Sequence, residues 1–126
     1  MSTAARPATR MWIPQDNPSV YKALVALQRA SSAGVDPELA ELIVIRASQL
    51  NGCAYCLHMH TSDSLAKDIG PHKLMMIAAW REAGSAFTPA ERAALALTES
   101  VTLIGENGVP DDVFDSARAH FDAAAM

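Results

Sequence analysis

The stretch ELIVIRASQLNGCAYCLHMHTSDSLAKDIG, residues 41–70, decides how this chain folds. Its first part, up to Leu50, has a helical apolar pattern, and Asn51-Gly52 then breaks that helix. A second helix is predicted from about Cys53 to Asp68, with Gly70-Pro71 as its stop. The stretch therefore predicts two helices joined by a tight turn, which is an antiparallel helical hairpin.

Cys53, Cys56 and His60 form a C-x-x-C-x-x-x-H motif at the start of the second helix. Helical residues at these offsets share one face, so the two thiols and the imidazole lie along that face over about two turns. A thiol pair that can close to a disulfide, beside a group that can accept a proton, is a redox centre. The helix N-terminus favours a thiolate at Cys53, and His60 can take the proton of Cys56 one turn away. Both cysteines thus have a reason to be reactive, and the spacing does not rank them.

Glu41 is the second residue that this stretch singles out. The helix that carries it, predicted from Pro37 to Leu50, has almost no polar face around Leu42–Ile45, which predicts a buried helix. Because the chain is predicted to reverse at Asn51-Gly52, Glu41 and His60 come opposite each other. A carboxylate beside a histidine fixes the tautomer of the imidazole and holds it ready to accept a proton.

Two other interpretations of these residues compete with a redox centre. A cysteine pair on a helix can be small core filler, but His60 and Glu41 would then be unexplained buried polar groups. Alternatively, Cys53, Cys56, His60 and Glu41 supply four ligands for zinc in a non-enzymatic metal-binding or redox-sensing protein. Structural zinc sites usually pair C-x-x-C with a second ligand pair, which this chain lacks.

The rest of the sequence is also helical in pattern. No segment alternates apolar and polar residues as a strand does, and Thr88-Pro89-Ala90-Glu91 is a capping box that opens a helix. The predicted elements are an extended arm over residues 1–17, helices over 18–31, 37–50, 53–68, 72–80 and 89–104, and a last helix from residue 111. The predicted fold class is therefore all-α, with residues 18–126 as one domain.

Composition and charge exclude several functional classes. The chain has 126 residues, half of them hydrophobic, and a net charge of −4 without a cluster of Lys or Arg, so no nucleic-acid partner is expected. The first residues have no apolar core segment, which predicts neither a secretory signal nor a membrane span. We therefore expect a cytoplasmic protein, and in a reducing compartment a C-x-x-C pair is typically catalytic or metal-binding.

Some polar and aromatic side chains are predicted to lie outside the redox face. His58, His72 and His120 are expected at the surface. Arg46, in the apolar helix, is expected to pair with a carboxylate of another helix. For Tyr55, between the cysteines, a packing role and a role of its hydroxyl in the site both remain open.

Residues 41–70 and the later stretch IAAWREAGSAFTPAERAALALTESVTLI, residues 77–104, resemble the AhpD-like branch of the carboxymuconolactone decarboxylase superfamily. That branch carries the signature E-x(11)-C-x-x-C-x-x-x-H, and this chain matches every spacing at Glu41, Cys53, Cys56 and His60. The resemblance extends over roughly residues 18–121. The decarboxylase branch does not use this cysteine pair, so the intact motif argues against a decarboxylase.

The resemblance implies an all-α bundle around a central helical hairpin, assembled into a homo-oligomer. It implies a thiol-dependent peroxidase that reduces alkyl hydroperoxides in antioxidant defence, without a metal or flavin. Cys56 would be the thiolate that attacks the peroxide, Cys53 the resolving thiol, His60 the proton acceptor, and Glu41 its partner in a water-linked relay. A lipoylated or other dithiol protein would return the electrons.

Two departures from the family pattern carry expectations of their own. Some active members have histidine just before the second cysteine, where this chain has Tyr55, which implies a weaker relay or a different reductant. Related chains also continue with apolar helix, whereas this one ends at residues 122–126, which predicts a short or truncated member of the family. An exposed core face is then expected either to be covered by a neighbouring subunit or to lower stability.

Overall fold

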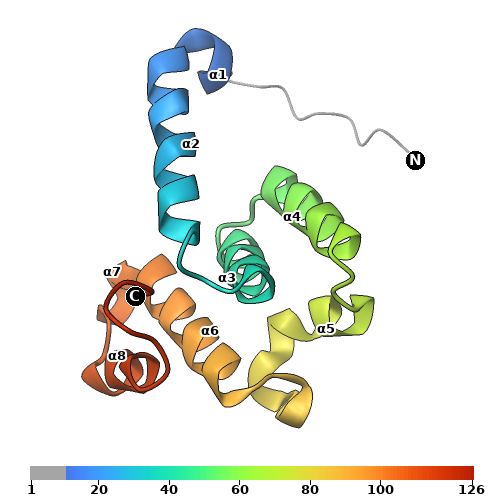
Figure 1. The fold of residues 1–126 in the computed structure, drawn as a ribbon, viewed down its shortest axis with the longest axis vertical. Coiled ribbons are helices and arrows are strands. Elements are labelled where there is room, and N and C mark those ends of the chain that lie inside the picture. The colour runs from blue at the N-terminus through green and yellow to red at the C-terminus, as the bar shows by residue number, and fades with distance from the viewer. Residues whose placement is uncertain (1–10) are drawn as a thin grey trace. The chain divides into compact units, whose positions relative to one another are not determined.

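The computed structural model describes residues 11–126, and their regular structure is entirely helical. The elements are α1 (Ile13–Asp16), α2 (Pro18–Ser32), α3 (Pro37–Leu50), α4 (Ala54–Ala66), α5 (Pro71–Met76), the 3-10 helices η1 (Ile77–Glu82) and η2 (Gly84–Ala86), α6 (Pro89–Thr102), α7 (Ile104–Asn107) and α8 (Asp111–Arg118) (Figure 1). The predicted all-α class is confirmed for this part of the chain. Within the same residues, no helix is long and apolar enough to cross a membrane.

Internal contacts divide the chain into a first unit that ends at Ala33 and a second unit, Gly34–Met126. The first unit contains α1 packed against α2. An extended arm was predicted over residues 1–17, but α1 forms a helical turn there, because Asp16 accepts a hydrogen bond from the backbone N–H of Trp12 at 2.7 Å. Residues 1–10 of the predicted arm lie outside the described residues, and the predicted domain division at residue 17 stays a prediction.

In the second unit, α3 is the helix on which the site depends. Asp36 caps its N-terminus by accepting a hydrogen bond from the N–H of Leu39 at 3.0 Å, and Pro37 occupies the first position. The helix packs against α4, α6 and η1, which confirms the predicted buried helix. The further expectations, that a central hairpin organises the whole bundle and that copies assemble, stay predictions.

The core of the second unit is a cluster of buried apolar side chains from four helices and two loops. Its members are Leu42, Ile45, Ile69, Leu74, Ile77, Trp80, Phe87 and Leu95. Fully burying one large apolar side chain stabilises a fold by about 1.5–3 kcal/mol. The predicted capping box at Thr88 and Glu91 is confirmed, with both reciprocal hydrogen bonds present at the start of α6. The site described below is thus attached to a packed core.

Several helix boundaries differ from those predicted, and two of the differences lie near the site. The predicted single helix over residues 72–80 is instead α5 followed by the 3-10 helix η1, and within η1 the backbone of Ala79 leaves helical geometry at φ −122° and ψ 30°. The predicted end of α4 near Asp68 and Gly70 is also wrong, because Asp68 already takes a left-handed φ of 60° and the helix ends at Ala66.

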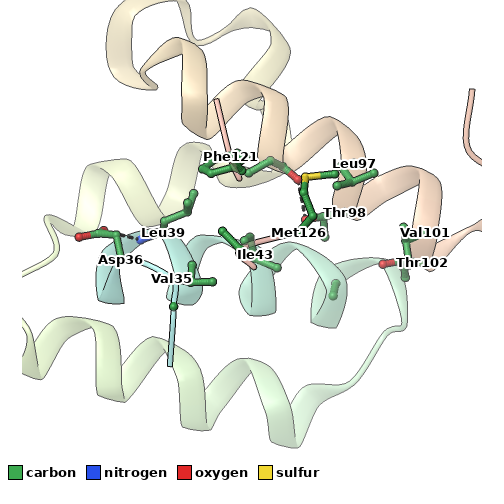
Figure 2. A pocket seen from close by; sticks show the side chains of 14 residues that line it. Val35, Asp36, Leu39, Ile43, Leu97, Thr98, Val101, Thr102, Phe121 and Met126 are labelled. Carbon is green, nitrogen blue, oxygen red and sulfur yellow. Dashed lines mark hydrogen bonds between the residues drawn. The ribbon is translucent and has the colours of Figure 1, made fainter. Parts of the chain in front are cut away.

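A cavity of about 540 Å³ opens between α3, α6 and the chain that follows α8 (Figure 2). Its walls are largely apolar and include Leu39, Ile43, Leu97, Val101, Phe121 and Met126. Leu39 and Ile43 lie one turn apart on α3, on a different side of the helix from Glu41. Since neither Glu41, His60 nor either cysteine lines the cavity, it is separate from the predicted redox face.

Candidate redox site

Cys53 lies in a turn that ends α3 and begins α4. The Gly52 N–H donates to the carbonyl of Gln49 at 3.2 Å, and the Cys53 N–H donates to that of Ser48 at 3.0 Å. These two bonds form a Schellman motif, and Gly52 supplies the left-handed φ of 63° that the motif needs. Cys53 is also the N-cap of α4, so the turn places the first cysteine at a helix N-terminus, as predicted.

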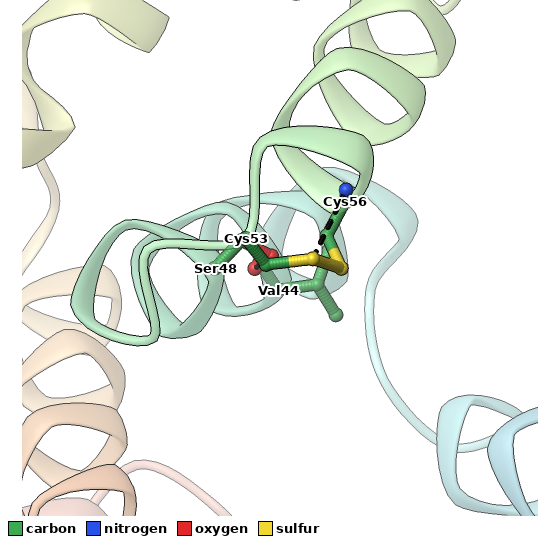
Figure 3. The surroundings of a disulfide bond; sticks show 4 residues. All are labelled: Val44, Ser48, Cys53 and Cys56. Carbon is green, nitrogen blue, oxygen red and sulfur yellow. Dashed lines mark hydrogen bonds between the residues drawn. A yellow bond between two sulfur atoms is a disulfide. The ribbon is translucent and has the colours of Figure 1, made fainter. Parts of the chain in front are cut away.

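Cys53 and Cys56 are joined by a disulfide bond, with their Cα atoms 5.3 Å apart (Figure 3). The N–H of Cys56 donates to the sulfur of Cys53 at 3.3 Å. Both residues are partly buried, and the bridge lies beside Val44 and Ser48 of α3. The motif can therefore close on itself, and both of its cysteines remain partly exposed.

The prediction that Glu41 faces His60 is confirmed. Nδ1 of His60 lies 3.4 Å from Oε2 of Glu41, and the Glu41 side chain is only 9% exposed. Both atoms are buried, and neither makes a hydrogen bond within the described residues. The separation exceeds an ordinary N–H···O hydrogen bond, so the two groups are in close contact without a hydrogen bond in this structure. A proton on Nδ1 directed at this carboxylate would leave Nε2 as the basic nitrogen of the imidazole.

Lys67 is a member of the site that the sequence interpretation missed. Its ammonium group donates to Oε1 of Glu41 at 2.5 Å, so the two oxygens of this carboxylate face different partners. That hydrogen bond raises the pKa of Lys67 above its ordinary value of 10.5. Lys67 lies seven residues after His60, on the face shared by the cysteines, so the helical spacing that grouped the motif could have found it.

Glu41, His60 and Asp63 are the potential metal ligands that come together in the described residues, with their ligand atoms within 4.8 Å of one another. The predicted zinc set of two cysteines, His60 and Glu41 is not brought together in this form, because the cysteine sulfurs bond to each other. Lys67 already places a positive charge on Glu41. The arrangement therefore fits a lysine–glutamate pair better than a cation site.

A second charged centre surrounds Glu99 on α6. Arg46 and Trp80 both donate to Oε1, at 2.9 and 2.7 Å, and Arg81 donates to Oε2 at 2.8 Å. Burial favours the neutral carboxyl group, but these hydrogen bonds outweigh it and hold the pKa of Glu99 below its ordinary value. The expected pairing of Arg46 with a carboxylate of another helix is confirmed.

The remaining predicted side chains lie outside the redox face or at the surface. His58, His72 and His120 are exposed, as expected. Tyr55 is 62% exposed, so it has no packing role in the core of this chain.

Comparison with known proteins gives the family. The model of the carboxymuconolactone decarboxylase family matches residues 18–100, about two-thirds of the chain. The chain belongs to the carboxymuconolactone decarboxylase family. The matched segment of this family member contains Glu41, Cys53, Cys56 and His60.

Two similar proteins place this family member more closely. It is 36% identical over 106 residues to the uncharacterized protein YdfG of Bacillus subtilis (strain 168). The matched region covers 83% of this chain and 71% of YdfG. A crystal structure of ATU0492 from Agrobacterium tumefaciens superposes with a TM-score of 0.85 at 37% identity, over 92% of this chain and 80% of that one. ATU0492 is a protein of unknown function for which a role in antioxidant defence, as an AhpD protein, has been suggested. The predicted AhpD-like branch of the family is confirmed.

Proposed function

We propose that this chain is a thiol-dependent peroxidase that reduces organic hydroperoxides through Cys53 and Cys56. The observation that carries the proposal is the disulfide at the start of α4, with the His60–Glu41 contact on the same helical face. Membership in the AhpD-like branch supports the same chemistry. In this proposal the disulfide is the oxidised state of the catalytic cycle.

The first step is attack of the Cys56 thiolate on one oxygen of the hydroperoxide. The O–O bond breaks, Cys56 becomes a sulfenic acid, and the alkoxide leaves as the alcohol after taking a proton. The Cys53 thiol then attacks the sulfenic sulfur, which forms the disulfide and releases water. An external dithiol reopens the bridge by exchange and becomes a disulfide itself.

His60 and Glu41 move the proton in this scheme. His60 takes the thiol proton of Cys56 at Nε2 and returns it to the departing alkoxide. Glu41 accepts a hydrogen bond from the Nδ1–H of the imidazole in this proposal. Its negative charge stabilises the imidazolium that forms between these two steps. This role explains why a carboxylate is kept buried on α3 with one oxygen turned towards a histidine.

The partners follow from the same site. A lipoyl-type dithiol or a dithiol protein is proposed as the reductant, because both cysteines are partly exposed and neither lines the apolar cavity. Neither a metal nor a flavin enters these steps. We also propose that copies of the chain assemble into a homo-oligomer, which light scattering of the purified protein would measure.

Peroxide consumption with dihydrolipoamide as electron source tests the proposal. Wild type should turn over cumene hydroperoxide, Cys56→Ser should be inactive, and Cys53→Ser should complete one turnover and hold a sulfenic acid that dimedone labels at Cys56. A dimedone adduct on Cys53 in Cys56→Ser, with none on Cys56 in the other variant, would reverse the two roles. Absence of turnover with every dithiol tried would overturn the peroxidase proposal.

A further inference from the structure

The two oxygens of Glu41 are divided between two partners, and this division points to a role for Lys67. Oε1 accepts the ammonium hydrogen bond of Lys67, and Oε2 is left facing Nδ1 of His60. A carboxylate with neither oxygen bonded could rotate and turn Oε2 away from the imidazole. With Oε1 held, Oε2 has one direction, which is towards His60.

We propose that Lys67 is a positioning residue of the redox site, which holds Glu41 in place so that its second oxygen orients His60. The inference rests on the proposed relay of Glu41 and His60. Lys67 does not touch the cysteines in this arrangement and acts on them through the other two side chains.

Burial gives the reason why Glu41 needs a cation. An ionised carboxylate that is taken from water is costly unless it is paired and hydrogen-bonded. The Glu41 side chain is 9% exposed, and Oε2 makes no hydrogen bond within the described residues, so Lys67 supplies its compensating charge. Asp63, the other carboxylate near this group, lies one turn before Lys67 and adds a second negative charge.

The end of α4 fixes where Lys67 can reach. The Asp68 N–H donates to Leu65 and the Ile69 N–H donates to Ser64, which is a second Schellman motif. Lys67 is the C-cap residue of the helix that this motif terminates. A lysine at a helix C-terminus is also favoured by the dipole. The backbone from which its side chain extends towards Glu41 is thus set by local structure.

Lys73 offers a matched comparison within the same chain. It donates to Glu38 and to Glu91, at 2.8 Å in each case, and is less exposed than Lys67. Neither of its carboxylate partners contacts His60 or a cysteine in the described residues. Loss of Lys73 should therefore cost more stability than loss of Lys67, whereas only loss of Lys67 should change the chemistry of Cys56.

The test is alkylation of the reduced full-length chain by iodoacetamide between pH 5 and 9, with Cys56 modification followed by peptide mass spectrometry. Lys67→Met should slow alkylation of Cys56 near neutral pH about tenfold, which is the change expected if the thiol titrates about one pH unit higher. Lys67→Arg, which keeps the charge, should stay within about twofold of wild type. Lys73→Met should give the wild-type profile although it lowers the denaturation midpoint.

Nitrogen-15 spectra of the His60 imidazole give an independent reading. Wild type should hold the Nδ1-protonated tautomer in its neutral form, and Lys67→Met should mix the two tautomers. Coincident alkylation profiles for wild type and Lys67→Met, or equal slowing by Lys73→Met, would overturn the inference. The alkylation profile and the nitrogen-15 spectra both use the reduced protein without peroxide. A positive Lys67 result would therefore stand even if the chain did not reduce peroxides. Equally, a negative Lys67 result would leave the peroxidase proposal untouched.

Discussion

Glu41 and Glu99 are two well-covered glutamates of the same unit, and they differ in how fully their oxygens are bonded. Three side chains donate to Glu99, and both of its oxygens are bonded. Glu41 receives one donor, from Lys67, and its other oxygen faces His60 without a hydrogen bond in the described residues. A fully bonded carboxylate ties helices together, whereas a partly bonded one beside a histidine keeps an acceptor available for proton transfer. We therefore expect Glu99 to contribute mainly to stability, and Glu41 to serve the proposed proton transfer.

The largest expected difference between the two centres is in peroxide turnover. His60→Ala should lower the rate about a hundredfold, because it removes the proton acceptor, and Glu41→Gln about tenfold. Glu99→Gln should stay within about twofold of wild type per folded molecule. Stopped-flow peroxide consumption measures all three, and an equal loss of rate in Glu41→Gln and Glu99→Gln would remove the distinction between the centres.

Stability should respond in the opposite order. Glu99→Gln should lower the free energy of unfolding by about 2 kcal/mol, because the guanidinium of Arg46 and the indole N–H of Trp80 lose a charged acceptor. Glu41→Gln should change it by less than about 1 kcal/mol, since its partner Lys67 is 49% exposed. Urea unfolding followed by circular dichroism gives both values, and a larger loss for Glu41→Gln would reverse the assignment.

Acid titration should sharpen this contrast. The pKa of Glu99 is lower in the folded chain than its ordinary 4.5, so its ionised form stabilises the fold above pH 4.5. That contribution is lost as the pH falls below 4.5 through the folded-state pKa. The difference in unfolding free energy between wild type and Glu99→Gln should therefore be constant from pH 7 to pH 5.5 and shrink below pH 4.5. A difference that grows towards pH 3 would contradict the assigned hydrogen bonds.

The turns at the two ends of α4 should change stability by no more than the loss of Glu99 does. Both Gly52 and Asp68 take a left-handed φ, at 63° and 60°, after the C-cap of a helix. Gly52→Ala should cost about 1–2 kcal/mol, and Asp68→Gly should gain up to about 1 kcal/mol, because glycine adopts this conformation without a steric penalty. Thermal unfolding measures both. Since Asp68→Gly keeps Lys67 in place, its alkylation profile at Cys56 should match that of wild type.

The sequence predicted the parts of this site that depend on helical spacing. The Asn51-Gly52 break and the regular offsets around it were sufficient to bring Glu41 opposite His60 and the cysteines onto one face. They were also sufficient to place α3 as a buried helix and to expect a carboxylate for Arg46.

Other features depend on contacts between distant residues and were not predicted. The partner of Arg46 is Glu99, 53 residues away, and no local pattern identifies which acid it meets. The 3-10 helix at Ile77–Glu82 carries Trp80, whose indole N–H donates to Glu99, 19 residues later in the chain. Helical spacing places Lys67 on the face of the cysteines, but it does not show that Lys67 bonds to Glu41, 26 positions away.

The most direct test of the redox assignment is a single-turnover oxidation of the reduced chain. One equivalent of cumene hydroperoxide should remove both free thiols, release one equivalent of the alcohol, and leave a Cys53–Cys56 disulfide visible as the loss of two hydrogen atoms in the intact mass. Both thiols persisting after excess hydroperoxide, while circular dichroism shows an intact helical fold, would contradict the account.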